Sequence, residues 1–115
     1  MMLNRISAEQ ILLLKTYDRY SGELTTHPLF FRQAGDRLVV AATNETETYK
    51  PEWYLNLKEE PIVEIERHGE TRFAVATTPV GIERMEIWPL VEELSLDTEK
   101  LQPRNVTGVL LTPME

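Results

Sequence analysis

The sequence predicts a mainly β protein with α-helical insertions, in which six mostly antiparallel strands form a small barrel. Short segments rich in β-branched and aromatic residues recur along the chain, and turn-forming residues separate them. The apolar residues take up a helical period only near residues 51–57 and 79–94. Six strand segments and two helical segments follow from these two observations.

Length and composition predict a single domain over residues 1–115. No internal repeat and no Gly/Ser-rich linker divides the chain, and its 115 residues are enough for one hydrophobic core. Hydrophobic residues make up 42% of the chain and charged residues 27%, as is usual in soluble globular proteins. No segment approaches the ~20 apolar residues of a membrane span, and the start of the chain lacks a secretory signal. We therefore expect a cytoplasmic protein that does not contact membranes.

Charge and residue usage exclude several functional classes. The net charge of −7 disfavours nucleic acids and anionic membranes as partners, because these need a basic surface. The absence of cysteine excludes disulfides and Cys-type zinc sites, and the two histidines, His27 and His68, lie far apart in the sequence. No catalytic triad, phosphate-binding Gly-rich loop or metal motif is present, so we identify neither catalytic nor metal-ligating residues. A small molecule is the expected partner.

The first strand is predicted over residues 11–17, which begin with an apolar run and end in alternation. Ser7 followed by Gln10 forms a capping box, so helix and strand compete at this point. We favour a strand from Ile11 with a short helical turn before it.

The next two strands are predicted at residues 24–33 and 37–43, on either side of an Ala34-Gly35-Asp36 turn. Pro28 lies inside the first of these segments and cannot donate a backbone hydrogen bond. It therefore indicates an edge strand or a bulge.

A second hairpin can be aligned by its side chains. With Ile65 opposite Phe73, Val63 faces Val75, Glu66 faces Arg72, and three residues remain for the loop, His68-Gly69-Glu70. Apolar pairs and a charge pair thus favour one register.

Two elements complete the chain. Residues 79–94 carry apolar side chains at i, i+3, i+4 and i+7, and Thr78 followed by Pro79 is a reasonable helix start. We expect Pro89 to kink this helix or to begin a second one. Residues 106–112 then form a buried closing strand.

The segment PEWYLNL at residues 51–57 predicts a short helix that begins at Pro51 and buries Trp53, Leu55 and Leu57. Asn56 does not fit this apolar face, because a buried amide needs hydrogen-bond partners. Two interpretations stay open: Asn56 holds neighbouring backbone in place, or it offers hydrogen bonds to a ligand.

The order of several motifs resembles the deazaflavin-dependent nitroreductase family, which consists of split β-barrel proteins of the flavin-reductase-like superfamily. The most specific part is a GDRLVV segment followed, after a fixed spacing, by WYLNL. The resemblance extends over most of the chain. The matching segments are DRYSGELTTHPL at 18–29, GDRLVVAAT at 35–43, WYLNL at 53–57, VEIERHGETRFAVA at 63–76, ERMEIWP at 83–89 and VTGVLLTP at 106–113.

The resemblance implies a six-stranded antiparallel split β-barrel of the FMN-binding split-barrel type and a bound deazaflavin coenzyme, F-420, with FMN as the alternative. Ala42 and Thr43 would line the ring or its linker, and Asn44 would follow them. Trp53 and Asn56 would hold the loop that these residues begin. The phosphate would be met by remaining basic residues. These are Lys15, Arg19, Lys50 and Arg104, of which Arg19 and Lys50 are the cofactor-binding candidates.

The implied function is an oxidoreductase that transfers a hydride to a small quinone-like or nitro acceptor. Such a coenzyme needs little side-chain chemistry, so the lack of catalytic residues does not exclude an enzyme. Compared with the family, the chain keeps only Arg19 of the cations near its first turn and carries Glu45 and Glu47 where a polyanion would run. The alternative is therefore a non-catalytic split-barrel binding protein that has lost the phosphate site. Exposed barrel edges predict a homodimer.

Overall fold

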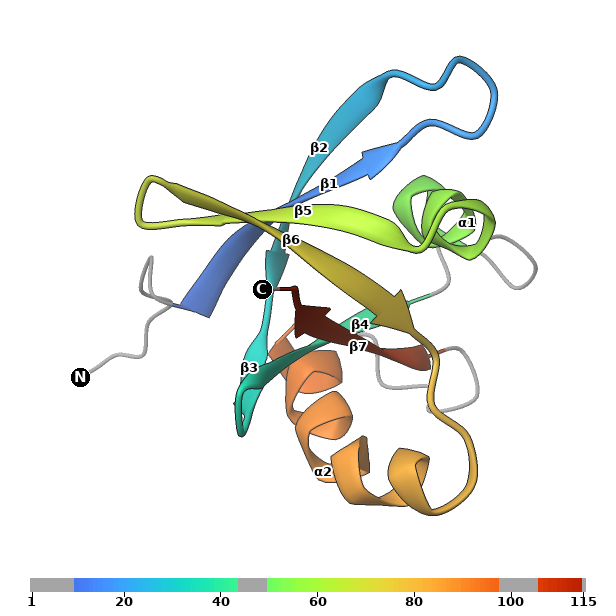
Figure 1. Cartoon of the computed structure of the whole chain (residues 1–115). Helices are drawn as coiled ribbons and strands as arrows, with labels where there is room; N and C mark the ends of the chain where they lie inside the picture. The colour runs from blue at the N-terminus through green and yellow to red at the C-terminus, as the bar shows by residue number, and fades with distance from the viewer. Residues whose placement is uncertain (1–9, 44–49, 98–105, 115) are drawn as a thin grey trace.

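The computed structural model describes residues 10–43, 50–97 and 106–114 as a curled antiparallel sheet with two helices (Figure 1). The sheet has the strand order β2-β1-β5-β6-β7-β4-β3. The mainly β prediction is confirmed, with seven strands in the described residues in place of six. The elements are β1 (Ile11–Tyr17), β2 (Leu24–Phe30), β3 (Arg32–Ala34), β4 (Arg37–Thr43), α1 (Glu52–Glu59), β5 (Ile62–Arg67), β6 (Glu70–Thr77), α2 (Gly81–Asp97) and β7 (Val106–Pro113).

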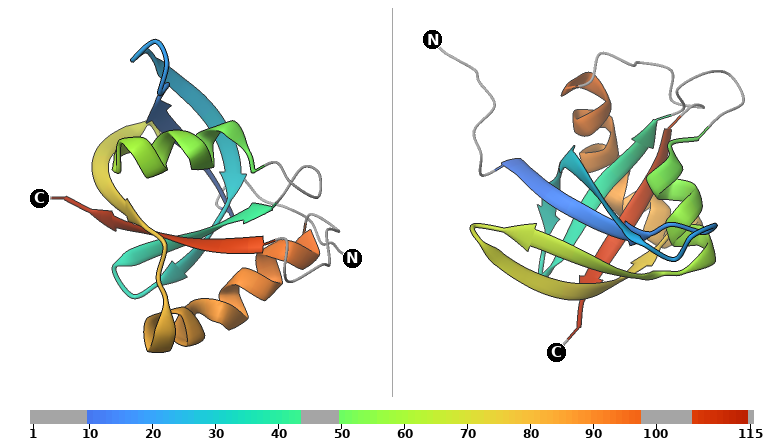
Figure 2. Two further views of the ribbon diagram at one scale, coloured as in Figure 1. Left: turned by 90° about the vertical axis from the view of Figure 1, so that its right-hand side faces the viewer. Right: turned by 90° about the horizontal axis from the view of Figure 1, so that it is seen from above.

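The extra strand arises because residues 24–33 do not form one continuous strand. The chain leaves β2 at one edge of the sheet, passes through the buried Phe31, and enters β3 at the other edge. Consecutive strands thus lie at opposite edges, so the sheet must curl into an incompletely closed barrel (Figure 2). Pro28 lies in the edge strand β2, as its missing N–H group predicts.

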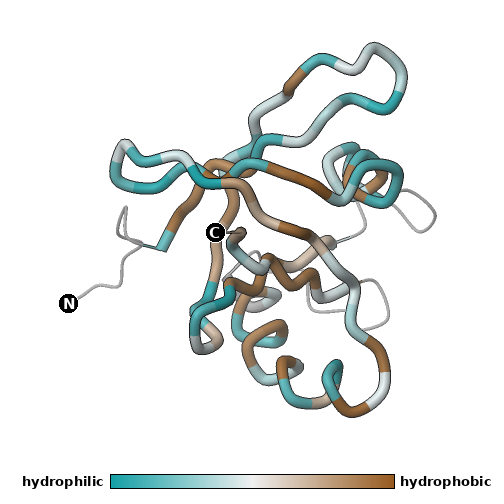
Figure 3. The backbone as a smooth tube through the Cα atoms, viewed as in Figure 1, coloured by the Kyte–Doolittle hydropathy of each residue, from teal (hydrophilic) through white to brown (hydrophobic). Residues whose placement is uncertain are grey.

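The hydrophobic core is divided by the sheet into two clusters. One lies inside the barrel, where alternate residues of β1 point inward, among them Leu12 and Leu14. The other lies between the outer face of β4 and β7 and the helix α2, and contains Val39 and Leu110. The apolar residues follow the central strands, whereas the hairpin tips are hydrophilic (Figure 3). α1 and α2 lie on opposite sides of β4 and β7 (Figures 1 and 2).

α2 is a single helix, so Pro89 does not begin a second one as one of the two predictions held. It begins at Gly81, two residues later than predicted, and continues to Asp97. Pro89 lies on the exposed side, and the carbonyl that loses its donor belongs to Met85, whose side chain is 71% exposed. Water can therefore replace the missing hydrogen bond. In the described part of the chain, no helix has the length and apolar character needed to span a bilayer.

The β5–β6 hairpin closes through two residues, not the three predicted. Arg67 pairs with Glu70, which leaves only His68 and Gly69 in the turn. Their φ angles are 54° and 78°. Positive φ at both central positions is typical of the tight turns whose twist matches that of a hairpin. Histidine tolerates this conformation better than most residues, but it is not among the usual signals for such a turn.

The shorter turn shifts the pairing register by one residue. Ile65 faces Arg72 and not Phe73, and Glu66 faces Thr71 and not Arg72. A shift of one residue moves every side chain to the other face of its strand. The Phe73 side chain is accordingly 50% exposed, on the outer face of the barrel.

Candidate functional site

α1 is the element around which the predicted site residues gather. Pro51 precedes the helix and its carbonyl accepts the backbone N–H groups of Tyr54 and Leu55. The buried face consists of Trp53, Asn56 and Leu57, at i, i+3 and i+4. Leu55, predicted to be buried, is only half-buried, because the helical period gives its place on that face to the polar Asn56.

The Asn56 amide is 2% exposed and joins α1 to the first hairpin. Its Oδ1 accepts one hydrogen bond from the Arg19 backbone N–H (3.2 Å) and one from the Arg19 Nη1 (2.8 Å), and its Nδ2 donates to Thr16 Oγ1 (3.2 Å). These contacts favour the structural interpretation, in which Asn56 fixes neighbouring backbone. The backbone that these hydrogen bonds fix is that of the β1–β2 turn. The loop that the resemblance implies Asn56 would hold lies mostly outside the described residues.

The hydrogen-bond chain continues from Thr16 into β2. Thr16 Oγ1 lies 3.3 Å from Thr25 Oγ1, which in turn lies 3.3 Å from His27 Nε2. Burial lowers the pKa of His27, so the imidazole is held in its neutral form at neutral pH. The network thus consists of neutral groups between β2 and the buried amide of Asn56.

Arg19 lies against α1, and its charge is already compensated there. Its Nη1 lies 2.9 Å from a carboxylate oxygen of Glu52, and its guanidinium lies 4.6 Å from the centre of the Tyr20 ring. Burial opposes the charge on Arg19, but the hydrogen bonds to Glu52 and Tyr20 outweigh it, and its pKa is raised. Arg19 thus links the β1–β2 turn to α1.

Two lysines on the other side of α1 are not neutralised in this way. Lys50 Nζ donates to Thr107 Oγ1 (2.8 Å) and lies 5.4 Å from the centre of the Tyr54 ring. Lys58 Nζ lies 5.9 Å from the same ring and donates to Thr78 Oγ1 (3.3 Å). Burial lowers the pKa of Lys50. Among the described residues, no carboxylate forms an ion pair with either ammonium group.

Sequence reasoning identified Lys50 but missed Lys58 and Tyr54. Positions 50, 54 and 58 are spaced by four residues, which places neighbouring side chains together on a helix surface. This spacing is the signal that could have found the pair of lysines and the ring between them.

The other residues predicted to bind the cofactor do not all lie beside Lys50 and Lys58. Ala42 is fully buried in the same core cluster as Trp53 and pairs with Thr107, the partner of Lys50. Thr43 follows at the end of β4. Lys15 forms a 2.8 Å ion pair with Glu66 and does not join the cations around α1. Asn44 and Arg104 lie outside the described residues.

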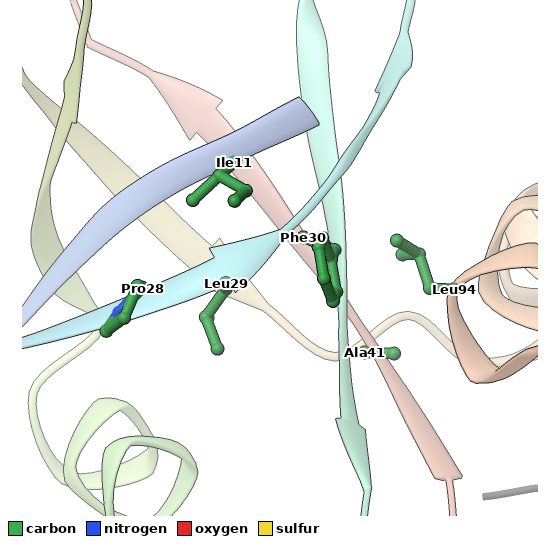
Figure 4. A pocket seen from close by; sticks show the side chains of 6 residues that line it. All are labelled: Ile11, Pro28, Leu29, Phe30, Ala41 and Leu94. Carbon is green, nitrogen blue, oxygen red and sulfur yellow. The ribbon is translucent and has the colours of Figure 1, made fainter. Parts of the chain in front are cut away.

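A cavity of about 380 Å³ lies at the gap between the two edges of the curled sheet. Phe30 from β2 and Leu94 from α2 point into the same space (Figure 4). None of the described residues that line it is titratable, so it suits a flat, largely apolar group. Its lining residues are Ile11, Pro28, Leu29, Phe30, Ala41 and Leu94.

None of the predicted cofactor-binding residues that the structure describes lines this cavity, although Ala41 directly precedes Ala42. The two alanines lie on opposite faces of β4: Ala42 faces the barrel interior and Ala41 faces the α2 side. Sequence reasoning missed the cavity because its apolar lining cannot be distinguished from ordinary core residues by residue type.

Comparison with known proteins gives consistent matches. A family model described as F420H(2)-dependent quinone reductase matches residues 2–111. The "F420H(2)-dependent quinone reductase Rv1261c" of Mycobacterium tuberculosis is 33% identical over 85 residues, which cover 71% of this chain and 56% of that protein. The protein named "Putative F420H(2)-dependent quinone reductase Rv3178", from the same organism, is 27% identical over 105 residues. These residues cover 89% of this chain and 88% of that protein.

Two solved structures share the fold. A structure titled as an F420-H2 dependent reductase (FDR-A) superposes with a TM-score of 0.74 at 22% identity, over 89% of this chain and 93% of that one. A structure titled "domain-swapped dimer" gives a TM-score of 0.76 at 22% identity, over 93% of this chain and 83% of that one. The likeness at these identities concerns the fold, and it confirms the predicted split β-barrel.

Proposed function

Because the chain belongs to the F420H(2)-dependent quinone reductase family, we propose that it is an oxidoreductase that transfers a hydride from reduced deazaflavin coenzyme F-420 to a small quinone-like acceptor. The observation that carries the proposal is the family match over residues 2–111. It also confirms the resemblance to deazaflavin-dependent reductases found in the sequence. The alternative of a non-catalytic binding protein is not supported by these comparisons.

The cavity at the barrel split supports this function by its size and lining. Its volume of about 380 Å³ is within the range of small-molecule sites, and its walls are apolar. A quinone ring is flat and mostly apolar, so it would gain from leaving water for such walls. Hydride transfer also benefits from excluding water around the reacting rings.

The two lysines at Tyr54 support the binding of an anionic coenzyme. An ammonium group that is partly buried without a carboxylate partner is incompletely stabilised, as the lowered pKa of Lys50 indicates. A phosphate or carboxylate of the coenzyme beside Lys50 and Lys58 would supply the missing charge. These lysines therefore take the role that Arg19, paired with Glu52, cannot easily take.

In the mechanism, the coenzyme supplies the hydride when it is bound, and the chain supplies position and shielding. Lys50 and Lys58 would hold the anionic part of the coenzyme near the end of β4. Trp53 and Asn56 anchor α1 to the barrel and to the β1–β2 turn, so the two lysines keep a fixed place. Phe30 and Leu94 line the cavity and would shield the acceptor from water.

A homodimer is a further part of the proposal. β2 and β3 are the edge strands of the sheet, and edge strands readily pair with a second chain. The structural neighbour titled as a domain-swapped dimer supports this assembly. Sedimentation of the purified chain tests it, and a species with the mass of one chain at all concentrations would contradict it.

The experiment that tests the function combines the purified chain with reduced F-420 and a water-soluble naphthoquinone. We expect oxidation of the coenzyme, followed by its absorbance, that depends on both the protein and the quinone. Reduced FMN and reduced nicotinamide coenzymes are the matched alternative donors. If oxidation of F-420 proceeds at the same rate with and without the protein, the proposed function is wrong.

A further inference from the structure

We propose that a second cavity, at the end of the barrel away from α1, binds a small ligand bearing a carboxylate or phosphate group through Arg67 and Arg72. This cavity has a volume of about 200 Å³ and is lined by both arginines. Leu38, near the start of β4, lines it, whereas Ala42, near the other end of β4, lies in the core cluster with Trp53 of α1. The tip of the β5–β6 hairpin and α1 accordingly lie at opposite sides of the molecule (Figure 1).

Arg67 has a buried donor without a partner. Its nearest cross-strand neighbour is Glu70, but the two side chains form no ion pair. The Arg67 guanidinium instead lies over the Phe31 ring, 4.5 Å from its centre. Its Nε is buried and has no hydrogen-bond partner in the described structure. A buried polar atom of this kind is costly unless a ligand or water completes it.

Arg72 adds a second guanidinium to the same cavity. It pairs with Ile65, a residue buried in the barrel interior, so the Arg72 side chain leaves the strand on the inner face. It makes no ion pair or hydrogen bond within the described residues. Two guanidinium groups on one cavity are suited to an oxyanion, because each presents a planar set of donors that matches two oxygen atoms.

Three of the other four described arginines form ion pairs in this chain of net charge −7, and the fourth, Arg84, lies over the Trp88 ring. Arg19, Arg32 and Arg37 each form an ion pair with a glutamate, at 2.9, 2.9 and 3.1 Å. An acidic chain offers many carboxylates, and these three arginines use them. Arg67 and Arg72 do not, although Glu70 lines the same cavity.

The acidic neighbours of the cavity limit the charge of its ligand. Asp36 and Glu70 line it together with the arginines, so a polyanion would be repelled. A ligand with one oxyanion group could bind the arginines and keep the rest of its surface toward the carboxylates. The proposed site therefore binds a small ligand with one anionic group. This proposal does not depend on the proposed oxidoreductase function.

The test follows the Nε–H resonances of the arginines by nuclear magnetic resonance during titration with butyrate and, separately, with inorganic phosphate, at constant ionic strength. We expect a saturable shift of the Arg67 resonance with a dissociation constant of about 1 mM or lower for at least one of the two probes. The probe that gives the shift identifies the carboxylate or the phosphate as the recognised group. No saturable shift with either probe at about tenfold higher concentration would overturn the proposal.

Three variants assign the binding. Arg67→Lys keeps the charge but loses the planar donor set. Arg72→Gln removes an exposed charge with little risk to folding. Each substitution should weaken ligand binding about tenfold or more. Arg84→Lys is the matched control, because Arg84 also lies over an aromatic ring, 4.3 Å from the centre of Trp88, but does not line the cavity. Equal binding by all three variants, measured by calorimetry, would show that the arginine pair is not the site.

Discussion

Asn56 and Arg19 are joined by two hydrogen bonds to one oxygen: the Asn56 Oδ1 accepts the backbone N–H of Arg19 at 3.2 Å and its Nη1 at 2.8 Å. The same amide donates to Thr16 at 3.2 Å. The helix α1 is thereby fastened to the β1–β2 turn. Because Lys50 lies just before α1 and Lys58 lies in its last turn, this fastening also sets the position of the proposed coenzyme-binding lysines.

Asn56→Ala should lower the free energy of unfolding by about 1–3 kcal/mol, because it leaves buried donors and an acceptor without partners. Chemical denaturation followed by circular dichroism measures the change. Gln33→Ala is the control, since the amide of Gln33 is exposed and bonds only to the nearby Gly35 carbonyl (3.1 Å). If Asn56→Ala leaves stability unchanged but abolishes coenzyme binding, Asn56 contacts the coenzyme and its structural role is secondary.

Gly108→Ala should destabilise the protein by about 1–3 kcal/mol through overpacking between β7 and α2. A Cβ atom at this position would lie 2.8 Å from Val91 Cγ2 and 3.2 Å from Ile87 Cδ1. The double variant Gly108→Ala/Val91→Ala removes the closest contact, so its loss should be smaller than the sum of the two single losses. Additive losses in thermal unfolding would show that α2 does not pack this closely on β7.

Asp18 should stabilise the first hairpin in a pH-dependent way. Its Oδ2 accepts the backbone N–H groups of Ser21 (2.8 Å) and Tyr20 (3.1 Å). The hydrogen bond from Ser21 is the largest effect on this carboxyl and lowers its pKa. A lowered folded-state pKa means that the stabilisation is present above the ordinary pKa and is lost as the pH falls through the folded-state value.

Asp18→Asn should therefore be less stable than the parent chain near neutral pH, and the difference should shrink once the pH falls below about 4. Unfolding curves recorded at several pH values measure it. Glu23→Gln, a charge change in the same connection, is the control. A difference that stays constant between neutral and acidic pH would contradict the assigned role of the Asp18 carboxylate.

Ala41→Leu should impair the reaction with quinone by filling part of the 380 Å³ cavity. We expect a KM for the quinone raised by about tenfold with little change in coenzyme binding, because the added side chain occupies space that the acceptor needs. Ala34→Leu is the matched control, since Ala34 packs against the same outer core cluster but does not line the cavity. Equal kinetic effects of the two substitutions would place the acceptor elsewhere.

Much of the fold could be predicted from local patterns, and the errors share one cause. Strand positions, both helices and the edge position of Pro28 follow from alternation, period and backbone chemistry. The β5–β6 register was missed because His68 takes a positive φ that no residue pattern signalled. The division at Phe31 was missed because only the closing of the whole sheet sends β2 and β3 to opposite edges.

The candidate site was predictable to a smaller extent. The polar Asn56 in an apolar segment correctly indicated a buried amide with specific partners. Its partner Arg19, however, lies 37 residues away in the sequence, and the ion pair of Arg19 with Glu52 is equally non-local. Such contacts depend on how β1 and α1 pack, which a single sequence does not specify. The Lys50, Tyr54 and Lys58 cluster was locally encoded by its spacing and could have been found.

The central claim is that this chain binds deazaflavin coenzyme F-420 at the lysines beside Tyr54, and a fluorescence titration tests it most directly. We expect saturable binding of F-420 and weaker binding of FMN. Lys50→Gln should lower the affinity for F-420 about tenfold. Lys15→Gln should leave this affinity unchanged, because the ion pair of Lys15 with Glu66 lies away from α1. The absence of saturable binding of F-420 to the folded protein, or equal affinity in the Lys50→Gln and parent chains, would contradict the account.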